Sequence, residues 1–317
     1  MAKCIRFDDP EGVMIEYTGG KGASLSKMHQ SKLPVPNGFV ISAPFFNKYL
    51  EKTGLMEKII AKIDTIDFDN FSAIEDISAE IRKMIVDEPF PKDIEEEIAC
   101  CYAELGEEIQ AVAVRSSGTA EDLDDASFAG QQETFLYVLG QEDVLEKIRE
   151  CWASLYNGRA IFYRREKGFS EKQVSIAVVV QKMVNSEKSG VMFTVNPITK
   201  DHSAVLVEGA WGLGEGVVSG IVTPDNYVID KNTDKAIETY VSEKETMVVR
   251  DPSMRGSVEQ DVPDDLKEAR VLSDDELAEL SIMAKRIEAF FGKPQDIEWA
   301  IEKQQLYLLQ SRPITTL

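Results

Sequence analysis

The spacing of apolar and polar residues predicts where this chain forms helices. Residues 45–106 carry apolar side chains at helical intervals among many acidic ones, with proline interruptions, so several amphipathic helices are expected there. A short helix is expected from Lys21 to Gln30, after a glycine-rich stretch, and a longer one from Asp143 to about Lys167. A last helix is expected from Ser273 to Phe291, because the sequence SDDE at its start has the form of a capping box.

Strands are predicted where short apolar runs are bounded by glycine, proline or polar residues. These runs lie at residues 33–42 (a turn into a strand), 111–115, 135–140, 175–184, 191–197 and 204–214, and a terminal hairpin covers residues 296–313. Helices and strands alternate without the regular βαβ order of a doubly wound sheet, so the predicted fold class is α+β in two lobes. A polar stretch at residues 185–188 gives the boundary, with lobes of 1–185 and 186–317.

The charge balance narrows the possible partners. The chain has 317 residues, of which 56 are acidic and 35 basic, and its net charge is −21. Sequence-independent binding to nucleic acid and docking on an anionic membrane both need many Lys and Arg contacts, so neither is expected. An anionic ligand must therefore be held by a few placed cations.

The cysteines and the apolar runs indicate the compartment. The four cysteines form no CxxC pair, which disfavours structural zinc and favours reduced thiols. The first residues contain no apolar signal core, and the longest strongly apolar run, Ile176–Val180, is too short to span a bilayer. A soluble, cytoplasmic protein is predicted.

Two polar segments have the composition of phosphate-binding loops. Residues 18–24 place glycines and Lys21 before a helix, so backbone amides and an ammonium can approach an anion. The spacing differs from a Walker A loop, and a turn with a surface lysine is the more common explanation. The second segment runs from Arg115 to Thr134, is rich in hydroxyls and glycine, and includes Gly130. A long surface loop is the alternative, but its interleaved small and aromatic residues argue against disorder and favour function.

The terminal hairpin predicts a face with paired polar side chains. Alternate residues of a strand share a face, so Asp296 and Glu298 point to the same side. A turn centred near Gln304 places Glu298 opposite Gln310 and Asp296 opposite Arg312. The residues predicted for the other face are Ile297, Trp299 and Ile301 on the first strand and Tyr307, Leu309 and Ser311 on the return strand. A cross-strand salt bridge on a solvated face is the simple interpretation, but oxygen ligands beside an arginine also suit Mg²⁺ bound to phosphates.

Three further features bear on ligand chemistry. Residues 181–184 end an apolar strand, where backbone groups and Met183 can flank an adenine ring, although a core methionine explains the pattern equally well. The run from Trp211 to Gly220 does not fit GxGxxG, so a dinucleotide-binding fingerprint is rejected. The two histidines, His29 and His202, lie in no setting typical of a nucleophile or a metal cluster, so a catalytic triad or a zinc hydrolase is not expected.

Several segments also stand in the order typical of one protein family. They are GGKGASL, AVRSSGTAEDLDDASFAGQQET, CWASLYNGRAIFYR, VVVQKMVNSEKSGVMFTVNP, GLGEGVVSG, TPDNY and PQDIEWAIEKQQLYLLQSRPIT. Over about residues 17–316 the chain thereby resembles the nucleotide-binding domain of the phosphoenolpyruvate synthase, pyruvate phosphate dikinase and rifamycin phosphotransferase family. The resemblance implies an ATP-grasp-like fold with two lobes and ATP in the cleft between them.

The resemblance also implies a reaction, with ATP and Mg²⁺ as cofactors. Such domains split ATP to AMP and pass the β-phosphoryl group to a histidine on a separate swivelling domain, which passes it on to pyruvate or to a rifamycin hydroxyl. The resemblance implies that Lys21 and Arg115 are phosphate-clamping cations and that Gly130 and Thr134 belong to the loop that covers the phosphates. It implies an adenine hinge formed by Gln181, Lys182, Met183 and Val184. In the hairpin it implies a Mg²⁺-binding pair of Glu298 and Gln310, while Asp296 and Arg312 support the transferring phosphate.

The family's carrier loop, which ends in the phosphorylated histidine, has no counterpart in this sequence. The expected partner is therefore a phosphocarrier histidine domain outside this sequence, either on a separate chain or on a removed part of the same one. The chain is predicted to be an ATP-dependent phosphotransferase of the dikinase type, like pyruvate-water dikinase, that is incomplete for the full reaction. Two alternatives stay open, the donor domain of a rifamycin phosphotransferase and a non-catalytic ATP-binding or regulatory module. The complete set of candidate phosphate and metal residues favours an active donor.

Overall fold

The structure is a computed structural model that describes residues 3–106, 110–119, 133–171, 175–253 and 256–315. The chain forms two compact units, Met1–Ser31 with Asn37–Met183, and Lys32–Pro36 with Val184–Leu317. The segment Lys32–Pro36 groups with the second unit, whereas the sequence-based division placed it in the lobe of residues 1–185. The reason is an edge contact, because the backbone amide of Leu308 donates a hydrogen bond of 2.9 Å to the carbonyl oxygen of Pro34.

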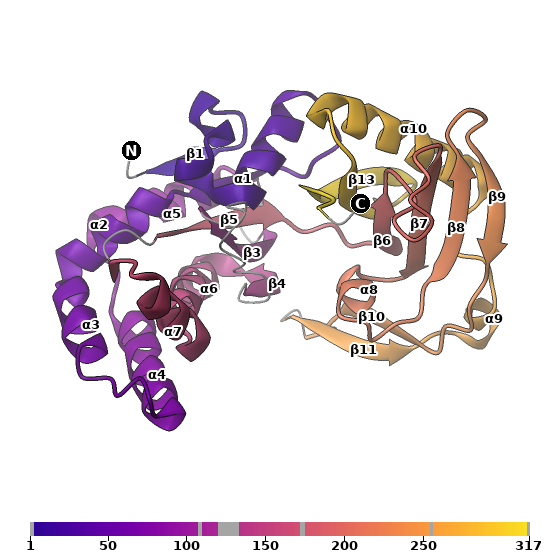
Figure 1. Cartoon of the computed structure of the whole chain (residues 1–317). Coiled ribbons are helices and arrows are strands. Elements are labelled where there is room, and N and C mark those ends of the chain that lie inside the picture. The colour runs from indigo at the N-terminus through magenta and orange to yellow at the C-terminus, as the bar shows by residue number, and fades with distance from the viewer. Residues whose placement is uncertain (1–2, 107–109, 120–132, 172–174, 254–255, 316–317) are drawn as a thin grey trace. The chain divides into compact units, whose positions relative to one another are not determined.

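The first unit is built on a five-stranded sheet with the order β1-β2-β5-β3-β4. All neighbouring strands are antiparallel. The strands are β1 (Cys4–Arg6), β2 (Gly38–Ile41), β3 (Ala111–Gly118), β4 (Thr134–Leu139) and β5 (Ile176–Lys182). The helical segments are η1 (Pro10–Val13), α1 (Ile15–Gln30), α2 (Ala43–Thr53), α3 (Leu55–Ile63), α4 (Phe71–Asp87), α5 (Lys92–Ala103), α6 (Gly140–Ala153), η2 (Ser154–Tyr156) and α7 (Gly158–Lys167). Helices α1 and α6 cover opposite faces of the sheet (Figure 1).

The core of the first unit lies between the sheet and the helices α2 to α6. The apolar run Ile176–Val180 is fully enclosed because β5 is the central strand, with β2 on one side and β3 on the other. On the helical side, Trp152 packs against Tyr49 and Phe46 with ring centroids 4.9 and 5.1 Å apart. This core explains why the amphipathic pattern of residues 45–106 resolves into four helices.

The prediction of one helix from Asp143 to about Lys167 is wrong. Two helices, α6 and α7, cover this stretch, and the short turn η2 separates them. At the break the hydroxyl of Ser154 donates to the carbonyl oxygen of Cys151 at 2.7 Å. The side chain of Asn157 accepts a hydrogen bond of 2.8 Å from the backbone amide of Ala160 and so caps α7. These polar side chains compete for backbone groups that a continuous helix would use.

The second unit contains a six-stranded sheet with the order β13-β12-β6-β7-β8-β9, again antiparallel between neighbours. Its strands are β6 (Lys188–Phe193), β7 (Ala204–Trp211), β8 (Asp225–Asp230), β9 (Lys235–Tyr240), β12 (Gln295–Glu302) and β13 (Gln305–Pro313). A separate pair consists of β10 (Thr246–Arg250) and β11 (Ser257–Asp261), and the helices are α8 (Glu215–Val218), α9 (Asp264–Lys267) and α10 (Asp274–Phe291).

Helix α10 lies against the large sheet (Figure 1). Side chains along one side of the helix are buried. The predicted capping box at its start is confirmed: the amide of Glu276 donates to the Ser273 hydroxyl at 3.3 Å, and the Glu276 carboxylate accepts from the Ser273 amide at 2.8 Å. Within the sheet, the indole of Trp299 lies over Gly190 and Gly209, where a Cβ atom would come within 3.0 and 3.4 Å of the ring. The glycines thus make room for this buried tryptophan.

A buried ionic network connects β8 to the segments around it. Lys244 and Asp225 are fully buried and form an ion pair of 2.7 Å. The Asp225 carboxylate also accepts hydrogen bonds from the Tyr227 hydroxyl at 2.8 Å and from the amides of Ser242 and Val271 at 3.0 and 2.9 Å. Because several donors compensate the buried charge, this carboxylate fastens the chain before α10 to the sheet.

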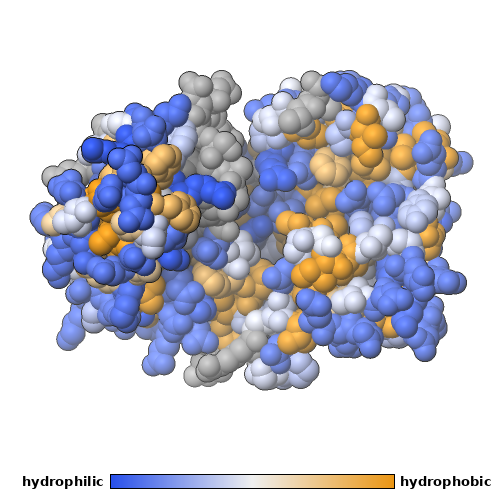
Figure 2. All heavy atoms as spheres, turned by 60° about the horizontal axis from the view of Figure 1, so that its bottom comes forward, coloured by the Kyte–Doolittle hydropathy of each residue, from blue (hydrophilic) through white to orange (hydrophobic). Residues whose placement is uncertain are grey.

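The surface is mixed in character. On the face shown in Figure 2, hydrophilic side chains predominate and hydrophobic ones lie between them. In the described part of the chain, no helix is both long and apolar enough to cross a membrane.

Candidate functional site

The predicted phosphate-binding lysine follows a kink in α1. Gly19 interrupts the helix with φ 68° and ψ 175°, a combination essentially restricted to glycine. A Cβ atom here would lie 2.5 Å from the carbonyl oxygen of Ser117, so the loop needs glycine to approach β3 so closely. Two residues later, the ammonium of Lys21 donates a hydrogen bond of 3.1 Å to the carbonyl oxygen of Ser116. The kink therefore brings Lys21 to the strand that carries Arg115.

Arg115 and Thr134 stand directly opposite each other on β3 and β4. Arg115 and Ser117 share a face of β3 because side chains alternate along a strand. Since Ser117 bonds to residues of α1, this is the face on which α1 packs. The first unit thus gathers Lys21, Arg115 and Thr134 into one region. Gly130, the other predicted residue of this loop, lies outside the described residues.

The predicted adenine hinge coincides with the passage from the first unit to the second. Gln181 and Lys182 end β5, Met183 is the last residue of the first unit, and Val184 belongs to the second. The amides of Lys182 and Met183 donate to the carbonyl oxygens of Asn37 and Ala111 at 2.9 and 3.0 Å. These bonds hold the end of β5, while the role of the segment toward adenine stays a prediction.

The terminal hairpin has the predicted register, for a reason that the sequence does not reveal. Its turn is formed by Lys303 and Gln304, both with positive φ, as in the primed turns typical of two-residue hairpins. If the pairing that starts at this turn ran on regularly along both strands, Glu298 would lie opposite Leu309. A bulge next to Glu298 makes Leu309 the extra residue, and Glu298 consequently faces Gln310. The predicted pairings of Glu298 with Gln310 and of Asp296 with Arg312 are both confirmed.

The same bulge overturns the predicted faces of the return strand. Tyr307 and Leu309 were expected to share a face with Ser311. Before the bulge, however, it is Leu308 that pairs with Trp299 in the core, and Tyr307 is only partly buried. After the bulge, Ser311 is buried and its hydroxyl donates to the side chain of Gln295 at 2.9 Å. Periodicity fails here because the bulge shifts the alternation by one residue.

The sheet register adds a carboxylate to this face. Gln310, Glu298, Val191 and Glu208 are successive directly opposed residues on β13, β12, β6 and β7, so they form one row on one face. Asp296 lies in the neighbouring row of the same face. Sequence reasoning missed Glu208, although it is the charged residue in the otherwise apolar run AVLVEGAW, and this was the available signal.

Two carboxylates on this face, Asp296 and Glu208, have raised pKa values, and a neighbouring carboxylate contributes to each increase. Nε of Arg312 donates a hydrogen bond of 2.8 Å to a carboxylate oxygen of Asp296, and Nη2 lies 2.7 Å from the same oxygen as an ion pair. Burial nevertheless raises the pKa of Asp296 against the opposing effect of Arg312, and the charge of Glu298 contributes to the increase. Burial, followed by the charge of Asp296, also raises the pKa of Glu208. The face therefore carries more negative charge than its arginine neutralises.

These residues fit a magnesium ion in their chemistry. The side-chain oxygen Oε1 of Gln310 is buried and has no hydrogen-bond partner among the described residues, and the residue is 7% exposed. A buried acceptor of this kind is costly unless something binds it. Mg²⁺ prefers oxygen ligands and commonly takes only one or two from the protein, with phosphates and water supplying the rest. Among the described residues, no group of three or more His, Cys, Asp or Glu side chains is placed to hold a metal.

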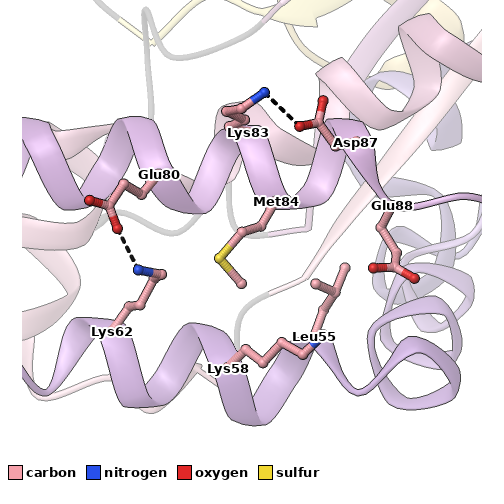
Figure 3. Close-up of a pocket in the computed structure, with 8 residues that line it drawn as sticks. All are labelled: Leu55, Lys58, Lys62, Glu80, Lys83, Met84, Asp87 and Glu88. Carbon is pink, nitrogen blue, oxygen red and sulfur yellow. Dashed lines mark hydrogen bonds and ion pairs between the residues drawn. The ribbon is translucent and has the colours of Figure 1, made fainter.

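A shallow pocket elsewhere in the first unit lies between α3 and α4 (Figure 3). Its charged residues include the ion pairs Lys62–Glu80 and Lys83–Asp87. None of the predicted site residues that the structure describes lines it. Because these charges are neutralised within the pocket wall, we assign it a structural role.

Comparison with known proteins places the chain in a family. Residues 15–317 match the family described as "Pyruvate phosphate dikinase, AMP/ATP-binding domain". The match covers nearly the whole chain, and the chain belongs to this family.

Relatives with curated names agree with this assignment. The chain is 49% identical to a probable phosphoenolpyruvate synthase of Methanothermobacter thermautotrophicus, over 100% of this chain and 47% of that protein. It is 48% identical to a probable phosphoenolpyruvate synthase of Methanocaldococcus jannaschii, over 98% of this chain and 26% of the relative. It is also 37% identical to the rifampicin phosphotransferase of Bacillus cereus, over 98% of this chain and 36% of that enzyme. The chain thus spans half or less of the length of these relatives.

Proposed function

We propose that this chain binds ATP with Mg²⁺ and donates a phosphoryl group to a histidine on a domain outside this sequence. Family membership supports the nucleotide. The observation that carries the metal is the buried oxygen Oε1 of Gln310, which has no hydrogen-bond partner among the described residues and lies on a face with excess negative charge. Such an arrangement is costly alone and is relieved by a cation that brings phosphate oxygens with it.

We further propose an ATP-grasp-like arrangement in which residues of both units hold the nucleotide. In the first unit, Lys21 and Arg115 neutralise phosphate charge, and Thr134, together with Gly130, belongs to the loop that covers the phosphates. Residues 181–184 flank the adenine. The proposal is supported by the convergence of Lys21 on β3 and by the direct opposition of Arg115 and Thr134.

In the second unit, Glu298 and Gln310 would hold the Mg²⁺, whose charge neutralises phosphate oxygens when it is bound. Asp296 keeps the guanidinium of Arg312 in place through a hydrogen bond and an ion pair, and Arg312 can then contact the transferring phosphate. Phosphoryl transfer depends chiefly on positioning and charge neutralisation, so these residues suffice for a donor site without a protein nucleophile.

The reaction proposed is cleavage of ATP to AMP with transfer of the β-phosphoryl group to the carrier histidine, in a cytoplasmic enzyme of the dikinase type. The names of the relatives favour pyruvate as the final acceptor. A rifamycin acceptor is the second candidate, because the rifampicin phosphotransferase of Bacillus cereus matches over nearly the same residues. Either acceptor would be bound by domains outside this sequence.

The test is calorimetric titration of ATP with and without Mg²⁺. Wild-type binding should require Mg²⁺, and Glu298→Ala should remove this requirement together with most of the affinity. Glu238→Ala is the matched control, because it deletes an exposed glutamate from β9, which three strands separate from β12. Equal Mg²⁺ dependence in wild type and Glu298→Ala would show that the hairpin is structural. With a supplied carrier domain, Lys21→Ala and Arg312→Ala should abolish AMP formation.

A further inference from the structure

Two consecutive serines on β3 connect the segments that carry the candidate phosphate-binding residues. Ser116 and Ser117 directly follow Arg115, and both are fully buried. Their backbones take part in the pairing of β3 with β5, where Ser116 lies opposite Val178 and Ser117 opposite Ala177. Their hydroxyls, however, bond to segments outside this pairing, which suggests a role beyond packing.

The hydroxyl of Ser117 fastens the lysine loop at both of its ends. It donates to the carbonyl oxygen of Thr18 at 2.8 Å and accepts from the backbone amide of Gly22 at 3.2 Å. Thr18 and Gly22 flank the three residues that end in Lys21. One side chain, 99 positions away in the sequence from Thr18, thus closes the loop that presents the ammonium.

Other contacts prevent this loop from shifting as a whole. Thr18 is fully buried, and its hydroxyl donates to the carbonyl oxygens of Gly12 and Met14 at 2.9 and 3.0 Å. Gly19 touches the backbone of Ser117 so closely that no side chain fits between them. The hydroxyl of Ser117 is therefore placed between two rigid elements, the anchored start of α1 and the strand β3.

Ser116 makes the corresponding connection toward β4. Its hydroxyl accepts from the amide of Glu133 at 3.0 Å, and its own amide donates to the carbonyl oxygen of Glu133 at 3.0 Å. Glu133 directly precedes Thr134. Meanwhile the carbonyl oxygen of Ser116 accepts from the Lys21 ammonium. The two serines thus tie Lys21, Arg115 and Thr134 to one piece of strand.

We propose that Ser117 is a positioning residue for ATP binding, which acts by holding the Lys21 loop against β3, with Ser116 doing the same for the entry to β4. The inference rests on the proposed function of Lys21. An ammonium on a loop flanked by glycines loses conformational freedom when it binds phosphate, and a loop that is already closed loses less. Ser117 contributes to affinity through Lys21, without touching the nucleotide.

A double-mutant cycle tests this dependence. Ser117→Ala should weaken Mg²⁺-dependent ATP binding about tenfold, whereas the same change in a Lys21→Ala background should weaken it less than about twofold. The difference is expected because the effects of two mutations in one hydrogen-bond network depart from independence by roughly 2- to 150-fold in the equilibrium constant. Ser26→Ala is the matched control. It removes a fully buried hydroxyl from α1, the helix that carries Lys21, and this hydroxyl has no hydrogen-bond partner among the described residues. Equal losses in both backgrounds would overturn the proposal.

Hydrogen exchange without nucleotide provides a second measurement that does not depend on activity. The amide of Gly22 should exchange at least about tenfold faster in Ser117→Ala than in the wild type, because its acceptor is lost, and it should be unchanged in Ser26→Ala. An unchanged Gly22 amide in Ser117→Ala would refute the tether. If Ser117→Ala does not fold, the cycle is run with Ser117→Cys, which keeps the volume but bonds weakly.

The two proposals fail in distinguishable ways. A wild-type chain that binds no ATP, or a Lys21→Ala variant that binds it normally, contradicts the proposed function, while the exchange of Gly22 still decides whether the tether exists. If Lys21→Ala loses ATP affinity as expected but Ser117→Ala binds ATP as tightly as the wild type, only the role of Ser117 is contradicted.

Discussion

Replacement of Gly19 by alanine is the sharpest test of how the lysine loop is built. Gly19 has φ 68° and ψ 175° at the kink of α1, two residues before Lys21. A Cβ atom there would lie 2.3 Å from the hydroxyl oxygen of Ser117, 2.5 Å from its carbonyl oxygen and 2.7 Å from its carbonyl carbon. Real Cβ atoms essentially never approach so closely, so either the loop or β3 must move.

The expected loss of stability has two parts. The backbone conformation itself costs about 1–3 kcal/mol for a residue other than glycine. The displaced loop also loses the hydrogen bonds of the Ser117 hydroxyl to Thr18 and Gly22, each worth roughly 0.5–1.5 kcal/mol net. The strand cannot yield easily, since Ser117 is paired with Ala177 on β5. The total is roughly 2–6 kcal/mol.

Gly54→Ala is the control for a glycine of positive φ, here in the left-handed helical region, that has no close contact. Gly54 has φ 65° at the end of α2, in the same unit, and nothing lies within 4 Å of the position that a Cβ atom would take there. Its substitution should cost about 1–2 kcal/mol through the left-handed conformation only. Both variants are compared by urea denaturation followed by circular dichroism, because most described helices belong to the first unit. ATP titration completes the comparison, and only Gly19→Ala should lose affinity.

Two results would refute this reasoning. If Gly19→Ala loses no more stability than Gly54→Ala, the close approach to β3 does not constrain the loop. If Gly19→Ala is destabilised as expected but binds ATP as tightly as the wild type, the loop conformation does not matter for the nucleotide.

Three further outcomes follow from the second unit. The raised pKa of Glu208 means that the folded state holds this proton more tightly than the unfolded state, so the stability of the fold falls as pH rises from the ordinary carboxyl pKa through the raised one. Without ligands, Glu208→Gln should therefore be more stable than the wild type at neutral pH and should lose this advantage in acid. An advantage that is equal at every pH would contradict this explanation. In urea denaturation, Asp225→Asn should cost about 3–5 kcal/mol of unfolding free energy, because it leaves Lys244 buried without its counter-charge. Asp274→Asn, at an exposed ion pair, should change the unfolding free energy by less than about 1 kcal/mol. Similar losses in the two variants would argue against the network. Ser273→Ala should cost about 0.5–2 kcal/mol by removing the cap of α10, and faster exchange confined to its first turn would locate the effect.

Much of the fold follows from local patterns in the sequence. The helices of residues 45–106, the buried strand at Ile176–Val180 and the capping box at Ser273 are all predicted correctly, because each depends on neighbours within a turn or on a short continuous apolar run. The hairpin itself is also predicted, but its pairing of Glu298 with Gln310 arises from a bulge that the sequence does not reveal. Where local polar groups compete with the helix, as at Ser154 and Asn157, periodicity alone misses the break.

Some residues of the candidate site can be recognised from the local sequence pattern, and others cannot. Lys21, Arg115, Glu298 and Gln310 carry their own signals, a glycine-flanked lysine, an arginine at a strand end and polar residues on a strand. Ser117 has no distinguishing signal, because nothing in the run RSSGT indicates which hydroxyl reaches the lysine loop.

The remaining features depend on segments far apart in the chain. Glu208 joins the row of Glu298 only because β6 lies between their strands, and the bulge at Leu309 exists only within the paired sheet. Likewise, Ser117 meets Thr18 across 99 residues. Local sequence encodes the conformation of each segment through interactions between near neighbours. Which strands and helices pack together depends on how the whole chain buries its apolar surface. A change in strand pairing can move the same side chain from a buried face, where it meets other residues of the site, to a solvent-exposed face.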